Sequence, residues 1–230
     1  EFPNSKYRER VNDYLVETYM NTRSYDAALK SIAKISKPGP RIMEAKQKIL
    51  FRLGTQSFAN AKFAEALQYF NRSLEIGRYN SATQADAYYW RGEANYRLEN
   101  YKSAGKDLRR YVELAKNKRS QEYGLALYNL GYTDFKQKNY SGALNWFSRF
   151  VNEGANDNKQ VLADAYNRMG DCNFYARKFD DARRSYDKAE QVDPSLADYS
   201  LYQEGFVKGL QRDYNGKIQA LNQLITNYPQ

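Results

Sequence analysis

The feature of this chain that most restricts its fold is an aromatic residue that recurs at nearly constant spacing. Each copy opens a segment with a helical pattern, and successive copies lie 38, 38, 39, 39 and 35 residues apart. The six positions are Tyr25, Phe63, Tyr101, Tyr140, Phe179 and Tyr214. A fixed period of roughly 20 to 50 residues indicates a repeat architecture, in which one supersecondary unit is copied along the chain.

Two further columns of small residues keep the same register. Nine residues before the aromatic, five of the six units carry glycine, and the first carries Val16 instead. The glycines are Gly54, Gly92, Gly131, Gly170 and Gly205. Three residues after the aromatic stand Ala28, Ala66, Ala104, Ala143 and Ala182, and Lys217 replaces alanine in the last unit. Three columns that stay in register over six units establish the repeat.

Each unit divides into two predicted helices joined by a short polar segment. The second helix shows the clearest pattern: Tyr140, Ala143, Phe147 and Phe150 are spaced by 3, 4 and 3 residues and so share one helix face. Several second helices are followed by a glycine or a proline, which ends a helix. Because such a helix pair cannot bury its apolar face alone, successive pairs are expected to stack.

The small-residue columns suggest how the two helices of a pair meet. Glycine costs about 1 kcal/mol in a helix interior, so its recurrence there favours a close helix approach. Alanine supplies a matching small surface on the second helix, and we expect Gly131 and Ala143 to face one another.

The best unit, "ADAYNRMGDCNFYARKFDDARRSYDKAEQVDPS" at 163–195, resembles the tetratricopeptide repeat (TPR) family. The matching positions are Tyr166, Met169, Gly170, Phe179, Ala182, Tyr186, Ala189 and Pro194. The resemblance implies an all-α, right-handed α-solenoid of about six stacked antiparallel helix pairs. The expected units are 5–40, 41–78, 79–116, 117–155, 156–194 and 195–230, within a single solenoid over 1–230. The family's usual period is about 34 residues, so these units are longer than usual.

Long units with an aromatic–proline joint also resemble those of bacterial cell-envelope TPR proteins. Such joints occur at Phe2–Pro3 and at Tyr228–Pro229, which suggests an excerpt of a longer repeat array. The resemblance implies a periplasmic or outer-membrane-associated location, with the cytoplasm as the alternative.

The composition argues against catalysis. The chain has no histidine, the commonest general base, and Cys172 is its only cysteine, so neither an internal disulfide nor a cysteine-cluster metal site can form. The sequence contains no phosphate-binding loop of the G-x-x-x-x-G-K-[ST] type and no G-x-S-x-G nucleophile motif. We therefore predict a protein that is not an enzyme and that uses no cofactor and no metal.

The net charge of +9 is unevenly distributed. Residues 1–155 carry 26 basic and 16 acidic residues, whereas residues 156–230 carry 10 and 11. A solvated basic surface is the favoured interpretation, and an acidic partner is the next. Nucleic acid is disfavoured, because its binders concentrate Lys and Arg on one face and here acidic residues are interspersed.

The TPR resemblance implies that the first helices line a concave groove. Residues three before and one after the glycine column should face it: Phe51, Tyr89, Glu93, Tyr128, Tyr132, Asn167, Asp171, Tyr202 and Phe206. These side chains either contact a ligand or pack on neighbouring units, and both interpretations stay open. If they contact a ligand, Tyr89 and Tyr128 of the middle units should be the most desolvated.

The predicted function is a protein–protein interaction scaffold that binds a polypeptide segment in this groove, with a role in cell-envelope assembly. One alternative is a structural segment that packs on its own flanking repeats or self-associates. A second is a basic module associated with nucleic acid.

Overall fold

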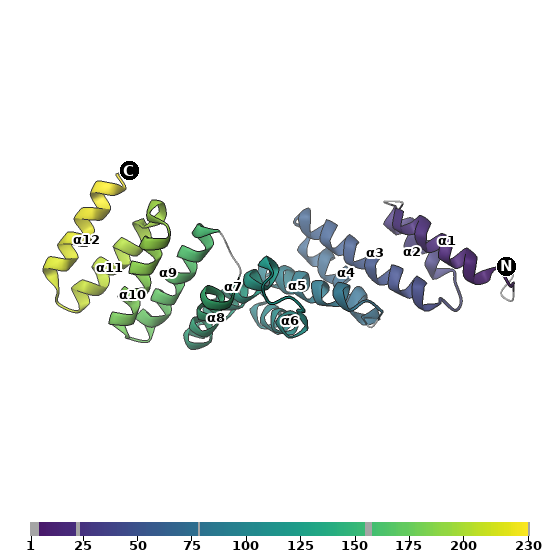
Figure 1. The fold of residues 1–230 in the computed structure, drawn as a ribbon, viewed down its shortest axis with the longest axis horizontal. Coiled ribbons are helices and arrows are strands. Elements are labelled where there is room, and N and C mark those ends of the chain that lie inside the picture. Colours follow the sequence, from purple (N-terminus) through teal and green to yellow (C-terminus); the bar gives the residue numbers. More distant parts are fainter. Residues whose placement is uncertain (1–4, 22–23, 78, 155–157, 230) are drawn as a thin grey trace. The chain divides into compact units, whose positions relative to one another are not determined.

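The structure, a computed structural model, describes residues 5–21, 24–77, 79–154 and 158–229. All regular secondary structure within these ranges is helical (Figure 1). The helices are α1 (Arg8–Asn21), α2 (Tyr25–Ala33), α3 (Pro40–Ala59), α4 (Phe63–Ile76), α5 (Ser81–Arg97), α6 (Tyr101–Leu114), α7 (Gln121–Lys136), α8 (Tyr140–Glu153), α9 (Lys159–Tyr175), α10 (Phe179–Val192), the 3₁₀ helix η1 (Pro194–Leu196), α11 (Asp198–Leu210) and α12 (Tyr214–Asn227). The Phe2–Pro3 joint lies outside the described residues.

The recurring aromatic residue marks the start of every second helix. Tyr25, Phe63, Tyr101, Tyr140, Phe179 and Tyr214 are the first residues of the even-numbered helices α2 to α12. The helix ends also follow the sequence: Gly77 succeeds α4, Gly154 succeeds α8, and the Asp193–Pro194 pair succeeds α10. The predicted all-α fold of consecutive helix pairs is confirmed.

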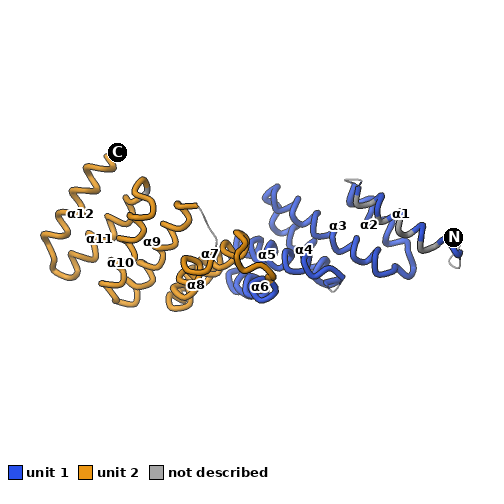
Figure 2. Tube along the Cα trace, viewed as in Figure 1, with its two compact units in different colours: residues 1–114 blue, residues 115–230 orange. Residues whose placement is uncertain are grey.

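The helices form two compact units, residues 1–114 and residues 115–230 (Figure 2). In unit 1, α3 packs on α4, α5 packs on α6, and α4 packs on α5, while α1 and α2 both contact α3. In unit 2, α7, α9 and α11 pair with α8, α10 and α12, and α8 and α10 each pack on the first helix of the next pair. The six predicted repeat limits are finer than this division and stay a prediction.

In the five helix pairs from α3–α4 to α11–α12, the joint contains a left-handed residue that is not glycine. Lys138 has φ 60°, and the equivalent residues Ala61, Glu99, Arg177 and Arg212 have φ between 57° and 65°. The N–H of Lys138 donates to the Phe135 carbonyl and that of Asn139 donates to the Asp134 carbonyl, each at 2.9 Å. This pair of hydrogen bonds is a Schellman motif, which usually has glycine at the left-handed position.

The glycine column admits a large side chain of the partner helix. A Cβ added to Gly131 would lie 2.6 Å from the ring of Phe147, and one added to Gly54 would lie 2.5 Å from that of Phe70. The three atoms nearest to a Cβ at Gly131 belong to Phe147, and the expectation that Gly131 also faces Ala143 stays a prediction. Phe147 lies one helical turn after Ala143, and its ring occupies the space that a Cβ at position 131 would fill.

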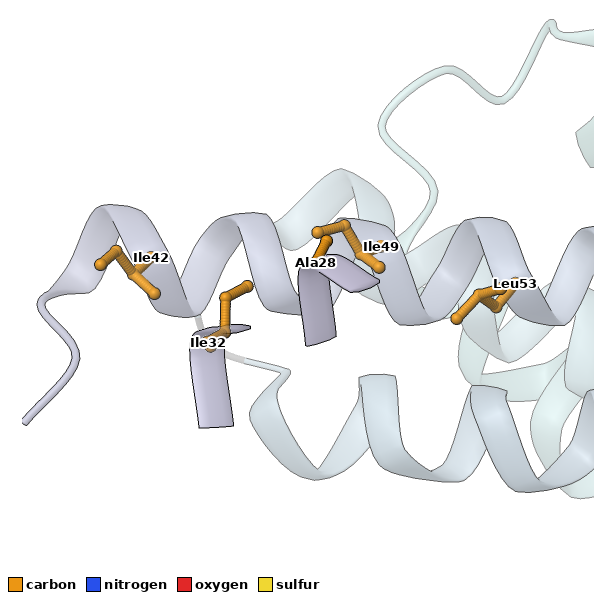
Figure 3. Close-up of a cluster of buried hydrophobic side chains, with 5 residues drawn as sticks. All are labelled: Ala28, Ile32, Ile42, Ile49 and Leu53. Carbon is orange, nitrogen blue, oxygen red and sulfur yellow. The ribbon is translucent and has the colours of Figure 1, made fainter. Parts of the chain in front are cut away.

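Two residues of the alanine column, Ala28 and Ala182, lie where a second helix meets the first helix of the next pair. Ala28 of α2 belongs to a buried cluster with Ile32 of the same helix and Ile42, Ile49 and Leu53 of α3 (Figure 3). Ala182 of α10 packs equivalently with Val207 of α11. The column residues Ala66, Ala104, Ala143 and Ala182 are fully buried. At Ala28 and Ala182, the small side chain thus serves the stacking of one helix pair on the next.

Candidate protein-binding surface

The residues predicted to meet a ligand form two groups, one in each compact unit. Phe51 lies on α3, and Tyr89 and Glu93 lie on α5, in unit 1. Unit 2 holds Tyr128 and Tyr132 on α7, Asn167 and Asp171 on α9, and Tyr202 and Phe206 on α11. On α5, α7, α9 and α11 the two members are four positions apart, which places them one turn apart on one helix face. We call these six residues of unit 2 the first-helix surface.

The aromatic residues of the unit 1 group pack on second helices. The ring of Phe51 lies 6.0 Å from that of Phe70, and the ring of Tyr89 lies 5.2 Å from that of Tyr111. All three residues of the group are half-buried. Part of the aromatic surface in unit 1 is therefore used in stabilising its own helix pairs.

In unit 2, a single carboxylate joins α7 to α9. The hydroxyl of Tyr128 donates to Asp164 Oδ2 at 2.7 Å, and the hydroxyl of Tyr132 donates to the same oxygen. Arg168 Nε lies 3.5 Å from Asp164 Oδ1. Burial, reinforced by the charge of Asp164, raises the pKa of both tyrosines well above the usual range. These phenols therefore remain hydrogen-bond donors that hold the two helices together.

A second carboxylate joins α9 to α10 and α11. Asp171 Oδ1 accepts hydrogen bonds from the hydroxyls of Tyr186 and Tyr199, each at 2.9 Å, and Asp171 Oδ2 lies 2.5 Å from Arg168 Nη1. Burial raises the pKa of Asp171, although the charge of Arg168 opposes this shift. Burial also raises the pKa of Tyr199 to about 12. Asp171 is thus an inter-helix tie within unit 2.

The sequence prediction missed Asp164, Arg168 and Tyr199 as members of this network. A signal for two of them was present: positions 164, 167, 168 and 171 follow the 3-, 4- and 7-residue spacing of one helix face, and all four are polar. Tyr199 carried no comparable signal, because its position on α11 acquires a partner only when α11 packs beside α9.

Asn167 differs from its neighbours because part of its hydrogen-bonding capacity is unused. Its side chain is 6% exposed, and its Oδ1 atom has no hydrogen-bond partner among the described residues. A buried acceptor without a donor costs about 1–3 kcal/mol, so a donor supplied by a ligand would gain most at this atom. On α11, Tyr202 and Phe206 are 54% and 46% exposed, and the ring of Phe206 lies 5.8 Å from that of Phe174 on α9.

Outside this network, two further kinds of chemistry concern the lone cysteine and metal ligands. Cys172 is buried on α9, and burial raises the pKa of its thiol to about 12, so the reactive thiolate does not form near neutrality. No group of three or more metal-ligating side chains occurs in the described ranges. In the same ranges, every helix is too short or too polar to cross a membrane.

Repeated helix pairs, each stacked on the next within its unit, define a helical-repeat protein. Family profiles described as tetratricopeptide repeat match residues 51–119, 163–196 and 199–230, which together make up more than half of the sequence. The chain belongs to the tetratricopeptide repeat family. Proteins of this family are generally non-catalytic interaction modules, and the fold supports the same class of function here.

Solved structures of other TPR proteins share the fold. MamA from Desulfovibrio magneticus RS-1 is 19% identical, with a TM-score of 0.66 over 79% of this chain and 94% of its own. YrrB, described as a TPR protein with an unusual peptide-binding site, is 18% identical, with a TM-score of 0.67 over 90% and 93%. No curated protein matches the sequence of this chain.

Proposed function

We propose that this protein is a non-enzymatic scaffold that binds a polypeptide segment on the first-helix surface of unit 2, across α9 and α11. The observation that carries the proposal is the buried, unpartnered Oδ1 atom of Asn167. A peptide backbone N–H is a donor that suits this atom. The asparagine NH₂ group can donate to a peptide carbonyl in return, so one side chain can align an extended backbone.

Tyr202 and Phe206 complete the proposed site as anchors. Aromatic side chains supply a large contact area while losing little rotamer entropy, and they are enriched among residues that dominate binding energy. Both are substantially exposed, whereas Tyr128 and Tyr132 already donate to Asp164. The anchors are therefore expected on α11, and the tyrosines of α7 are expected to keep α9 in place. The description of YrrB as a peptide-binding TPR protein adds support by analogy.

The test is a peptide selection followed by calorimetry. Peptides selected from a displayed random library against the wild-type chain are titrated into wild type, Tyr202→Ala and Asn167→Ala. Loss of an anchor at Tyr202 should weaken binding by about 2 kcal/mol or more, roughly thirtyfold. Tyr214→Ala is the matched control, because Tyr214 is 63% exposed but starts α12. Selected peptides that bind all four proteins equally would remove the first-helix surface from the mechanism.

We further propose a location in the bacterial cell envelope, either periplasmic or outer-membrane-associated. The support is the resemblance of the long units and aromatic–proline joints to envelope TPR proteins. Fractionation of the source cells with an antibody against the chain tests this, and recovery with the cytoplasmic fraction would contradict it.

A second candidate function is self-association through the last helix pair. Several large apolar side chains on α11 and α12 are exposed, with Leu210, Tyr214, Ile218 and Ile225 between 51% and 70%. In a stacked array such a face is covered by another helix pair, which a second copy of the chain could supply. Sedimentation of wild type and of Ile218→Glu/Ile225→Glu over a concentration series tests this. A wild-type chain that stays monomeric throughout would exclude it.

A further inference from the structure

A charged hollow lies on the second-helix side of unit 1, between α5 and α6. Its volume is about 490 Å³, and its lining residues are Tyr88, Arg91, Lys106, Asp107, Arg109, Arg110 and Glu113. A smaller hollow of about 290 Å³ adjoins it through the shared residues Arg91, Lys106 and Asp107, and adds Asn71, Asn95 and Ser103 to the lining. We call the two together the α6 basin. None of its residues belongs to the group predicted to face a ligand.

One wall of the α6 basin is an internally satisfied ion pair. Arg91 Nε and Nη2 donate to the two carboxylate oxygens of Asp107 at 2.8 Å and 2.6 Å, and Arg91 Nη1 donates to Asn71 Oδ1 at 2.8 Å. Asp107 is 4% exposed, and Asn95 Nδ2 lies 3.4 Å from its Oδ2 atom. A bidentate pair of this kind is geometrically specific, so it fixes the positions of the Arg91 and Asp107 side chains. The two charges neutralise one another.

The rest of the α6 basin carries surplus positive charge. Lys106 is exposed and makes no hydrogen bond or ion pair within the described ranges. Arg109 is a second cation of the lining, and it already makes an interaction of its own. Arg110 pairs with Glu113 at 2.7 Å, but their side chains are 49% and 61% exposed, and such surface pairs are easily exchanged for other partners. Four basic and two acidic groups line the larger hollow, which leaves it with a charge of +2.

We propose that the α6 basin binds an acidic peptide segment, with its carboxylates on Lys106, Arg109 and Arg110. The basin follows α6 from Ser103 to Glu113, which at 1.5 Å per residue is about 15 Å. An extended peptide rises about 3.3 Å per residue, so four or five residues match this length. Arginine presents a planar fork that fits a carboxylate, and Asn95 and Ser103 offer neutral hydrogen-bonding groups along the path.

Nucleic acid is a poorer fit to the same surface. Its phosphates repeat continuously and demand an unbroken track of Lys and Arg, whereas Asp107 and Glu113 interrupt the positive charge of the basin. A short run of carboxylates can instead be placed between these two acids. The inference is independent of the first-helix surface, because it concerns other helix faces and another unit.

The experiment is a fluorescence-anisotropy titration with a fluorescein-labelled hexaglutamate peptide at low ionic strength, where surface charges are least screened. Lys106→Gln should weaken binding about fivefold, as expected for one exposed charge contact. Glu113→Gln should tighten binding about threefold, because it frees Arg110 and removes a repelling charge. Lys30→Gln is the matched control: it removes one exposed positive charge from α2 of the same unit and should change nothing.

The outcomes separate the proposal from its alternatives. Opposite effects of Lys106→Gln and Glu113→Gln, with an unchanged control, support the site, since a non-specific charge effect would move Lys106→Gln and Lys30→Gln equally. No binding of hexaglutamate, or equal weakening by both lysine variants, would overturn it. A labelled oligothymidine that binds more tightly than hexaglutamate would overturn it in favour of nucleic acid. A labelled hexaglutamine peptide that binds as tightly would show that charge is not recognised, which also overturns it.

Discussion

Replacing Gly131 with alanine tests the steric role of the glycine column. The added Cβ would lie 2.6, 2.7 and 2.8 Å from three ring atoms of Phe147, whose side chain is fully buried. Carbon atoms in favourable contact are about 3.5–4.0 Å apart, so the ring must move by about 1 Å. Overpacking of this kind costs about 1–3 kcal/mol, against which alanine regains about 1 kcal/mol of helix propensity. We expect a net loss of about 0–2 kcal/mol in the free energy of unfolding.

Gly205 provides a control at the same column position in the same unit. A Cβ there would lie 3.2 Å from the end of the Leu221 side chain, which is half-buried and flexible. Because little must move, the helix-propensity gain should dominate, and Gly205→Ala should be more stable than wild type by about 1 kcal/mol. The two alanine variants should therefore differ by about 1–3 kcal/mol in favour of Gly205→Ala.

Urea unfolding followed by circular dichroism measures both variants against wild type. A combined Gly131→Ala/Phe147→Leu variant adds a double-mutant cycle: alanine should cost less opposite leucine, because a flexible branched side chain yields more easily than a ring. If Gly131→Ala is as stable as Gly205→Ala, the glycine column does not exist to admit the ring, and our account of how the two helices of a pair meet is wrong.

Two further predictions concern the joints and the acidic side chains of unit 2. Lys138→Gly should stabilise the protein by up to about 1 kcal/mol. Glycine removes the steric cost of the left-handed conformation, and this gain outweighs the larger conformational entropy that glycine gives the unfolded chain. Lys188→Gly, inside α10, should instead cost about 1 kcal/mol, and thermal unfolding that shows the same sign for both would contradict this. Burial, followed by the charge of Glu204, raises the pKa of Asp187 above its value in the unfolded chain. The stability that this group contributes is therefore fully present at pH values below the unfolded pKa, and it is lost as the pH rises through the folded pKa. Wild type should therefore lose more stability than Asp187→Asn between about pH 4 and 7, and equal urea midpoints for the two across this range would refute it.

The candidate site was only partly accessible from the sequence. The first-helix register predicted that Asn167, Tyr202 and Phe206 each lie on the ligand-facing side of their helix, because face membership follows from helix periodicity. It could not show that Asn167 lacks a partner for its Oδ1 atom or that Tyr128 already has one. Hydrogen-bond pairing depends on side chains from helices more than 30 residues apart, and no local pattern records it.

The α6 basin illustrates the same limit for charge. The sequence showed an excess of basic residues before position 155, with acidic residues interspersed. It did not show that Arg91 and Asp107, sixteen residues apart, neutralise one another, so that Asp107 is not available to pair with the neighbouring Lys106. Net charge is a sum over the chain, whereas the local field depends on which charges the packing of α5 against α6 brings together.

The sequence by itself determined the helical repeat and the residue that opens each second helix, because periodic apolar residues, aromatic starts and glycine or proline ends act locally. Only the tertiary structure decided which surfaces these small residues serve. Gly131 admits the ring of Phe147 within a pair, whereas alanines such as Ala182 lie at the contact with the next pair. It also decided that Lys138 and its equivalents take a left-handed conformation that their residue types disfavour. The packing of the two joined helices compensates for that local cost, and this energy arises only when distant segments meet.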